Sequence, residues 1–303
     1  MIIQESPADP LSDVLALAGA RAFCSVRLEA GGDWALRFDP AELKFNAVRR
    51  GACWLLAEGL APRRIEAGDC FVVRRPFVLT SDPALPPVDA AAVFADGRAA
   101  RYGEGDDVDI LGGAVSFARS APFHPAQLLP PVLVVGAGEE APIAWLLDQL
   151  DREWRGGAAG ALLACNDLLR LMFVHVLRVH LASAGPAGLG WLAGLSDPPV
   201  AAALKAIHAQ PARAWRLEEL ADLAGMSRSS FAERFRRRTG QPPIDYAARW
   251  RMQLAAARLL AEPVSVSIVA QDLGFLSDSA FGAAFRRVHG VSPGRYRRHA
   301  ARA

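Results

Sequence analysis

The chain has 303 residues, of which 52% are hydrophobic and 22% are charged, and its formal net charge is +2. This length suits two domains with separate cores, and the composition is that of a folded protein rather than a disordered or fibrous one. No apolar run is long enough to span a membrane, and the first residues lack the basic and apolar regions of a secretory signal, so we expect a cytoplasmic protein.

Residues 1–140 are predicted to form a β-rich domain. Short runs of β-branched and aromatic residues alternate there with Gly, Asp and Pro turn residues, a pattern typical of a sandwich or a barrel. The expected strands cover residues 25–28, 34–38, 53–56, 70–73 and 77–79, and a further β segment covers residues 109–117.

Residues 141–196 are predicted to form a helical linker. Ile143, Leu146, Leu147 and Leu150 recur at helical spacing, and a second helix over residues 161–181 is apolar around most of its circumference. Such a helix must be buried on several sides, either inside its own chain or at the interface of a homodimer. The linker is therefore a candidate dimerisation segment.

The charge of the chain is distributed unevenly. Residues 196–303 contain 17 Lys and Arg against 9 Asp and Glu, whereas the rest of the chain contains 17 basic and 23 acidic residues. A basic C-terminal part beside an acidic N-terminal part suggests that only the former meets a polyanion.

An internal repeat occupies this basic region. Phe231, Phe235, Gly240 and Pro243 recur 50 residues later, and so do Arg236 and Arg237, as Arg286 and Arg287. The offset is 49 before the turns, where Ala221 matches Ala270 and Gly225 matches Gly274. Two copies are too few for a solenoid, so the repeat predicts a duplicated structural unit.

Each copy predicts a helix, a glycine turn and a second helix. Gly225 suits the left-handed conformation that ends a helix, and Ser227 can cap the next one. A helix pair of this kind can present its second helix to the major groove of DNA. The expected core residues of the two pairs are Leu220, Ala221, Gly225, Phe231 and Phe235 in the first, and Ala270, Gly274, Phe281 and Phe285 in the second.

Residues 199–298 resemble the AraC/XylS family of bacterial transcription regulators. The resemblance is carried by Leu217-Glu218-Glu219-Leu220-Ala221, Gly225-Met226-Ser227 and Phe235-Arg236, and by Leu273-Gly274-Phe275, Phe285-Arg286-Arg287 and Gly290-Val291-Ser292-Pro293. It implies a DNA-binding domain, residues 197–303, in which two helix-turn-helix units are joined by a long helix over about residues 245–260. The units would read successive major grooves about 34 Å apart.

The resemblance also implies which residues meet DNA. The base-reading positions are Arg228, Ser229, Ala232 and Glu233 in the first unit, and Asp278, Ser279, Gly282 and Ala283 in the second. The phosphate-contacting positions are Ser227, Arg236, Arg237, Ser277, Arg286 and Arg287. Because Gly282 and Ala283 offer no hydrogen-bonding side chain, we expect the first unit to supply most of the base discrimination.

Residues 1–140 are similar to the cupin-like sensor domain of one branch of these regulators, on stretches 9–15, 32–38, 67–69 and 79–83. Asn46 and Phe77 stand where a metal-binding cupin would carry histidines, so we expect neither a metal nor another cofactor, and a cupin-type enzyme is disfavoured. Trp34, Phe38, Trp54 and Phe71 either line an effector pocket or fill a core.

The expected partners are double-stranded DNA, a small-molecule effector, a second copy of the chain and RNA polymerase, with no membrane. A redox-responsive regulator is the alternative, because Cys53 and Cys70 lie in predicted strands and could approach each other. The four cysteines form no CxxC pair, and buried inert thiols are the simpler interpretation.

Overall fold

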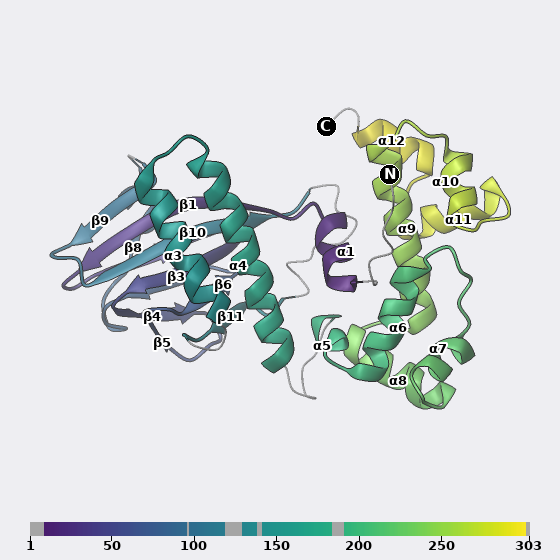
Figure 1. Cartoon of the computed structure of the whole chain (residues 1–303), viewed down its shortest axis with the longest axis horizontal. Coiled ribbons are helices and arrows are strands. Elements are labelled where there is room, and N and C mark those ends of the chain that lie inside the picture. The colour runs from purple at the N-terminus through teal and green to yellow at the C-terminus, as the bar shows by residue number, and fades with distance from the viewer. Residues whose placement is uncertain (1–8, 96, 119–128, 138–140, 184–190, 301–303) are drawn as a thin grey trace. The chain divides into compact units, whose positions relative to one another are not determined.

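The structure is a computed structural model that describes residues 9–95, 97–118, 129–137, 141–183 and 191–300 (Figure 1). Its residues group into two compact bodies. Residues 21–116 and 129–183 form a β-rich body, and residues 9–20, 117–118 and 191–300 form a helical body, within the described ranges. Each body has its own core, and the two are described separately.

The β-rich body contains two sheets that share one core, so of the predicted sandwich or barrel it forms a sandwich. The six-stranded sheet has the order β11 (Val132–Val135), β6 (Cys70–Val73), β3 (Leu43–Arg50), β10 (Val108–Ser116), β1 (Arg21–Gly31) and β9 (Ala99–Gly103). The five-stranded sheet has the order β5 (Arg63–Glu66), β4 (Ala52–Ala57), β7 (Phe77–Thr80), β2 (Ala35–Phe38) and β8 (Val88–Asp89). A short helix, α2 (Ala90–Val93), follows β8.

Every predicted strand overlaps an observed one and exceeds its bounds by at most one residue, at Trp34 and Phe117, but several strands were not predicted. The strands β3, β5, β9 and β11 carry charged side chains or are very short, which hides their period-2 pattern. In β5, for example, Ile65 is buried between exposed Arg64 and Glu66, and only its ladder partner Cys53 shows which face is internal. Their pairing with neighbouring strands therefore decides their structure.

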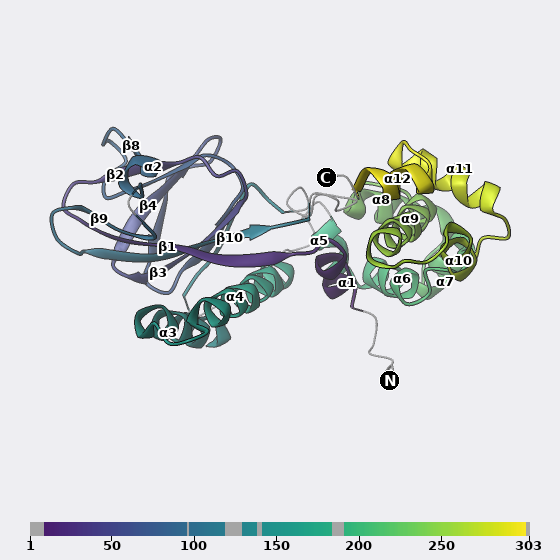
Figure 2. The ribbon, with the colours of Figure 1, turned by 90° about the horizontal axis from the view of Figure 1, so that it is seen from above.

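Two long helices, α3 (Ala141–Gly156) and α4 (Ala161–Ser183), cover the outer face of the six-stranded sheet (Figure 2). A buried ion cluster joins α3 to this sheet, because Arg27 of β1 pairs with Asp109 of β10 at 2.5 Å and with Asp151 of α3 at 2.9 Å. Leu169 of α4 packs so closely on β10 that a Cβ at Gly113 would lie 2.2 Å from its methyl group. Through these contacts, residues 141–183 form part of the same compact body as the two sheets.

The helical body contains nine helices in the described ranges. They are α1 (Pro10–Leu17), α5 (Trp191–Leu195), α6 (Pro198–Ala209), α7 (Leu217–Leu223), α8 (Arg228–Thr239), α9 (Pro243–Ala261), α10 (Val266–Asp272), α11 (Asp278–His289) and α12 (Pro293–Ala300). The predicted linking helix is α9, and it extends slightly beyond the expected bounds at both ends.

The first helix, α1, was not predicted. Asp9 caps it by accepting hydrogen bonds from Leu11 N and Ser12 N, and Pro10 occupies its first turn, so its start carried a local signal. It packs on α6 and α9, where Asp13 lies 3.0 Å from the buried His208 ring. The other ring nitrogen of His208 lies 2.7 Å from the Tyr246 hydroxyl.

Two turn glycines offer a matched test of backbone strain. Gly225 and Gly274 both adopt positive φ, +62° and +78°. A Cβ at Gly225 would meet nothing within 4 Å, whereas one at Gly274 would lie 2.3 Å from the Ala212 carbonyl oxygen. We expect Gly225→Ala to lower the free energy of unfolding by about 1 kcal/mol and Gly274→Ala by at least about 2 kcal/mol. Urea denaturation measures both, and equal losses would contradict the predicted clash.

Candidate nucleic-acid interface

Two helix pairs of the same design lie at the two ends of α9 (Figure 1). In both pairs the first helix, α7 or α10, has 7 residues and the second, α8 or α11, has 12. Ser227 accepts a hydrogen bond from Ser230 N at 3.4 Å, and Ser277 accepts one from Ala280 N at 3.2 Å. Each second helix therefore begins with the predicted serine cap and ends at a left-handed glycine, Gly240 or Gly290.

Seven of the nine predicted helix-turn-helix core residues are buried, whereas Gly225 and Gly274 lie exposed in the turns between the helices. The aromatic pairs Phe231–Phe235 and Phe281–Phe285 are fully buried, with ring centroids 5.6 and 5.8 Å apart. Leu220, Ala221 and Ala270 are also buried. These contacts fix α8 against α7 and α11 against α10, and they leave the opposite face of each second helix exposed.

The exposed face of α8 carries most of its predicted DNA-binding residues. Ser229, Glu233, Arg236 and Arg237 are exposed, and Ala232 is half-buried between them. Arg228 donates a 2.6 Å hydrogen bond to Glu218 of α7, and this bond holds the pKa of the Glu218 carboxyl below its ordinary value. The face thus combines hydroxyl, carboxylate and guanidinium groups, all of which can contact base edges or phosphates.

The corresponding face of α11 is less polar. Asp278, Ser279, Arg286 and Arg287 are exposed, and Asp278 accepts a short hydrogen bond from the Ser267 hydroxyl. Gly282 and Ala283 occupy the centre of this face, and they present only small apolar groups. The sequence predicted that the second unit offers fewer hydrogen-bonding side chains to bases than the first, and the exposed faces of α8 and α11 in the folded protein show this difference.

An ion cluster behind α8 was not predicted. Asp197 is buried and lies 2.9 Å from the side-chain Nε of both Arg234 and Arg238. Burial of Asp197 disfavours its charged form, but the hydrogen bonds from the two arginines outweigh this, so its pKa lies below the ordinary value. Asp197 precedes Pro198, a helix-start signal, but nothing local in the sequence identifies its partners.

The predicted effector-pocket residues do not all share one environment. Trp34 and Phe71 belong to the core between the two sheets, and Phe38 packs against this core, stacked on Phe77 with centroids 4.9 Å apart. Trp54 alternates with Cys53 and Leu55, whose side chains belong to that core, so it lies on the other face of β4. Only three of the four residues therefore lie in or against the core.

Asn46 lies beside this core. It pairs with Phe71 in the β3–β6 ladder and is buried, and its side-chain nitrogen has no hydrogen-bond acceptor among the described residues. Within the described part of the chain, no group of three or more His, Cys, Asp or Glu side chains is arranged to hold a metal ion.

The buried cysteines give a test of the redox alternative. Burial raises the pKa of the Cys53 and Cys70 thiols to about 12, and the Asp69 carboxylate adds to the effect at Cys70. Because the thiolate is the reactive form, we expect iodoacetamide at mildly alkaline pH to leave both unmodified in the native protein, as judged by peptide mass mapping. Unfolded protein is the positive control, and rapid native labelling of either thiol would support redox sensing. The side chain of Cys24 lies outside the described part of the structure.

Comparisons with known proteins agree with this architecture. A family model described as Cupin matches residues 9–182, and one described as Helix-turn-helix domain matches residues 220–299. An AraC-like transcription regulator of Streptomyces lividans is 45% identical over 299 residues, which cover 96% of this chain and 98% of that protein. The transcriptional activator RclR of Escherichia coli K12, described as RCS-specific, is 27% identical over 292 residues, which cover 95% and 97%.

Among solved structures, the DNA-binding domain of AdpA in complex with a target DNA is 36% identical, and the match covers 34% of this chain and 93% of that one, with a TM-score of 0.32. No helix in the described ranges is long and apolar enough to cross a membrane. A family model spans more than half of the sequence, and a relative 45% identical spans nearly all of it. The chain therefore belongs to the AraC family of transcription regulators, with an N-terminal cupin domain and a C-terminal helix-turn-helix domain.

Proposed function

We propose that this protein controls transcription by placing α8 and α11 in successive major grooves on one face of a DNA duplex. The observation that carries the proposal is the pair of equally built helix-turn-helix units on one connecting helix, each with an exposed second helix. A major groove admits one α-helix, and successive grooves on one face recur about every 34 Å. Because the partner is genomic DNA, the proposed place of action is the cytoplasm.

The test is a selection of sequences from random-pool DNA, followed by fluorescence anisotropy at several salt concentrations. The full chain is used because α1 and α5 pack in the same body as the two units. We expect a selected site to bind at least about a thousandfold more tightly than bulk DNA, with affinity falling steeply as salt rises. If no sequence is enriched and binding is only weak and salt-driven, the proposal fails.

The two units are proposed to contribute unequally to base readout. Glu233 offers a carboxylate that can accept a hydrogen bond from cytosine N4, whereas its equivalent Ala283 offers only a methyl group. We expect Glu233→Ala to reduce discrimination at one base pair by about 1–3 kcal/mol. Ala283→Gly serves as the matched control in the second unit. Base scanning of the operator that found equally strong discrimination in both halves would contradict this division.

The cupin domain is proposed to bind a small-molecule effector near Trp34, Phe38 and Phe71. The orphan side-chain nitrogen of Asn46 supports a ligand with a hydrogen-bond acceptor, because a buried donor without a partner is costly. Such an effector acts only if it binds the DNA-competent and incompetent states with different affinity. If small molecules from the cell change the affinity for DNA equally in the wild type and in Asn46→Val, Asn46 does not belong to the site.

The proposed oligomer is a homodimer formed through α4. Its inner face is buried within the chain, but Leu162, Leu163 and Leu171 remain 44–68% exposed. Leu163→Glu is expected to shift the protein toward monomer in sedimentation velocity, whereas Leu223→Glu on α7 is not. A wild-type protein that stays monomeric at high concentration would refute the dimer. RNA polymerase is a further proposed partner, in the case of transcription activation.

A further inference from the structure

Each helix-turn-helix unit has one side-chain hydrogen bond between its first helix and the start of its second helix. In the first unit Arg228, the first residue of α8, donates to Glu218, the second residue of α7, at 2.6 Å. In the second unit the hydroxyl of Ser267, the second residue of α10, donates to Asp278, the first residue of α11. The two bonds therefore occupy the same place in the two units.

The internal repeat makes these bonds equivalent. Glu218 corresponds to Ser267 at the offset of 49 that relates α7 to α10. Arg228 corresponds to Asp278 at the offset of 50 that relates α8 to α11. The first unit uses a carboxylate and a guanidinium, whereas the second uses a hydroxyl and a carboxylate. A contact that is kept although both of its residue types differ indicates a common role in the two units.

Stabilisation of the fold does not explain the two bonds. Arg228 and Glu218 are 67% and 53% exposed at their side chains, and Ser267 and Asp278 are also exposed. Water competes for exposed charged and polar groups, so pairs of this kind add little to the free energy of unfolding. The bonds do restrict the side-chain torsions of Arg228 and Asp278, which are both predicted to read bases.

Each bond leaves free the atoms that can contact a base. Glu218 engages only Nη1 of Arg228, and the Nε and Nη2 donors have no other partner among the described residues. These two donors form a fork that matches O6 and N7 of guanine. Ser267 engages only Oδ2 of Asp278, and Oδ1 accepts no bond from the rest of the described chain. A carboxylate oxygen in the major groove can accept a hydrogen bond from cytosine N4.

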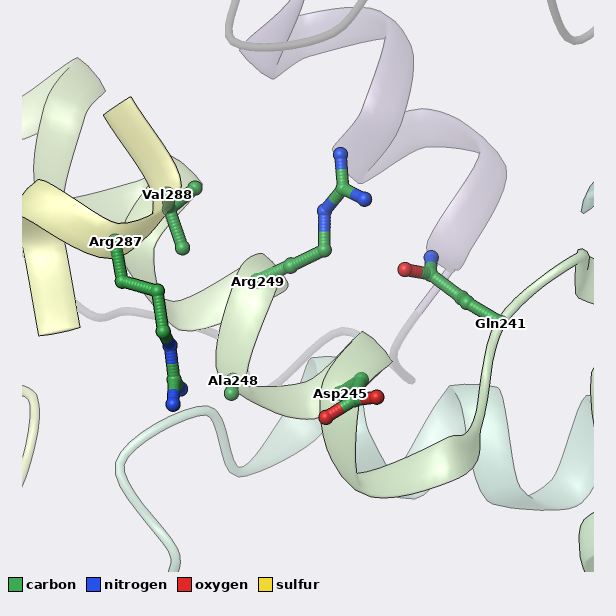
Figure 3. Close-up of a pocket in the computed structure, with 6 residues that line it drawn as sticks. All are labelled: Gln241, Asp245, Ala248, Arg249, Arg287 and Val288. Atoms are coloured by element: carbon green, nitrogen blue, oxygen red, sulfur yellow. The ribbon is translucent and has the colours of Figure 1, made fainter. Parts of the chain in front are cut away.

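The cavity between the two units contributes no support to these side chains. It lies between the start of α9 and the last turn of α11, and it is lined by Gln241, Asp245, Ala248, Arg249, Arg287 and Val288 (Figure 3). None of the predicted base-reading residues is part of this lining, and the side chains of Arg249 and Arg287 extend in opposite directions. The contacts that orient Arg228 and Asp278 thus come from within their own units.

We propose that the second residue of each first helix positions a base-reading side chain of the second helix. Glu218 holds Arg228 toward a guanine in the first half of the operator. Ser267 holds Asp278 toward a cytosine in the second half. A side chain that is held in one orientation before binding loses less conformational freedom when its base contact forms, which favours the matching base. This inference rests on the proposed placement of α8 and α11 in major grooves.

The first unit is tested on the selected operator by replacing each guanine in turn with 7-deazaguanine, which lacks the N7 acceptor. At one guanine we expect wild type to lose roughly fivefold or more in affinity, and Arg228→Ala to lose no more than about twofold. At that guanine Glu218→Ala should lose only about twofold, because its arginine is no longer oriented. Glu218→Gln keeps an oxygen acceptor and should respond as wild type does.

Two further measurements separate positioning from support of the fold. Glu218→Ala removes a negative charge beside the phosphates, so its affinity for bulk DNA should not fall, whereas damage to α8 would weaken binding to all DNA. Glu219→Ala is the matched control, because the Glu219 carboxylate accepts from Arg213 and from the Arg216 N–H and is not bonded to α8. This control should respond to 7-deazaguanine as wild type does.

The second unit is tested by changing the base that it prefers. Asparagine pairs with N6 and N7 of adenine, so Asp278→Asn should change the preferred base at one position from cytosine to adenine. Ser267→Ala should weaken the preference for cytosine at that position by roughly threefold or more. Ser267→Thr keeps the hydroxyl and should preserve the preference.

Three results would overturn the proposal. In the first, Glu218→Ala and Ser267→Ala weaken binding to all DNA and leave base preference unchanged. In the second, Glu219→Ala alters base preference as much as Glu218→Ala does. In the third, an operator is selected but no base pair in it depends on Arg228 or Asp278, which would refute the positioning and leave the proposed function intact. If no operator is selected, both fall, so the two failures are distinguishable.

Discussion

Replacing Asp197 with alanine is expected to destabilise the helical body by about 3–5 kcal/mol, because the change leaves a buried arginine without its counter-ion. Asp197 is only 2% exposed at its side chain, and Arg238 is 7% exposed. The Arg238 guanidinium cannot regain full hydration without opening the packing of α8 against α5 and α6, whereas Arg234 is 35% exposed. The same substitution should weaken specific DNA binding, since the cluster supports α8 from behind.

The measurement is urea-induced unfolding followed by far-UV circular dichroism. Asp272→Ala is the matched control, because Asp272 also lies 2.9 Å from an arginine, Arg258, but in an exposed pair. Exposed pairs contribute about 0–1 kcal/mol. If the free energy of unfolding falls no more in Asp197→Ala than in Asp272→Ala, the buried cluster adds nothing to stability.

The same carboxyl group predicts a pH dependence. The pKa of Asp197 lies below its ordinary value of 3.8, so the folded state binds the proton less readily than the unfolded state. Its contribution to stability is therefore present above pH 3.8 and is lost as the pH falls through the lowered folded-state pKa. The difference in stability between wild type and Asp197→Ala should shrink on acidification over that range.

Truncating an aromatic residue of either helix-turn-helix core is expected to cost about 3–5 kcal/mol. Phe231 and Phe281 are fully buried equivalents, each packed edge-on or tilted against a second phenylalanine four residues later. Phe231→Ala or Phe281→Ala removes that ring contact and leaves a cavity that the short helices α7 and α10 cannot close. Loss of core packing should also disorder the exposed face on the same helix.

Urea unfolding and operator binding measure the two effects. Phe231→Leu and Phe281→Leu keep most of the side-chain volume and should each cost less than about 1.5 kcal/mol. The comparison distinguishes the loss of packed volume from a general effect of changing the residue. In base scanning, Phe231→Ala should lose discrimination mainly in the first half of the operator, and Phe281→Ala in the second. A loss of stability below about 1 kcal/mol in both alanine variants would contradict the core assignment.

The sequence predicted the helix-turn-helix units well because their determinants are local. The periodicity of Phe231 and Phe235, the left-handed Gly225 and the cap Ser227 all act within a few residues of one another. The duplication added an independent check, since the same signals recur near Gly274. The candidate DNA-binding face follows from the same periodicity, because the buried side of α8 determines which residues are exposed.

Prediction was weaker in the β-rich body. The sequence grouped Trp34, Phe38, Trp54 and Phe71 as the lining of a pocket or as a filled core, although the ladder of β4 turns Trp54 to the other face. A single-residue shift in a strand reverses the direction of a side chain, and short strands give too few residues to decide it. The apolar helix α4 was predicted, whereas the surface that it covers was not.

The sequence by itself determined that a β-rich region precedes a helical one, and it determined the duplicated helix-turn-helix and the residues exposed on α8 and α11, because each is encoded in short-range patterns. It did not assign α1 to the helical body or residues 141–183 to the β-rich one. Only the tertiary structure decided the rest: the docking of α1 through Asp13 on His208, the burial of Asp197 between its arginines, and the cavity beside Arg249. These features join residues from 37 to 195 positions apart, and pairs so distant leave no periodic or local trace in a single sequence.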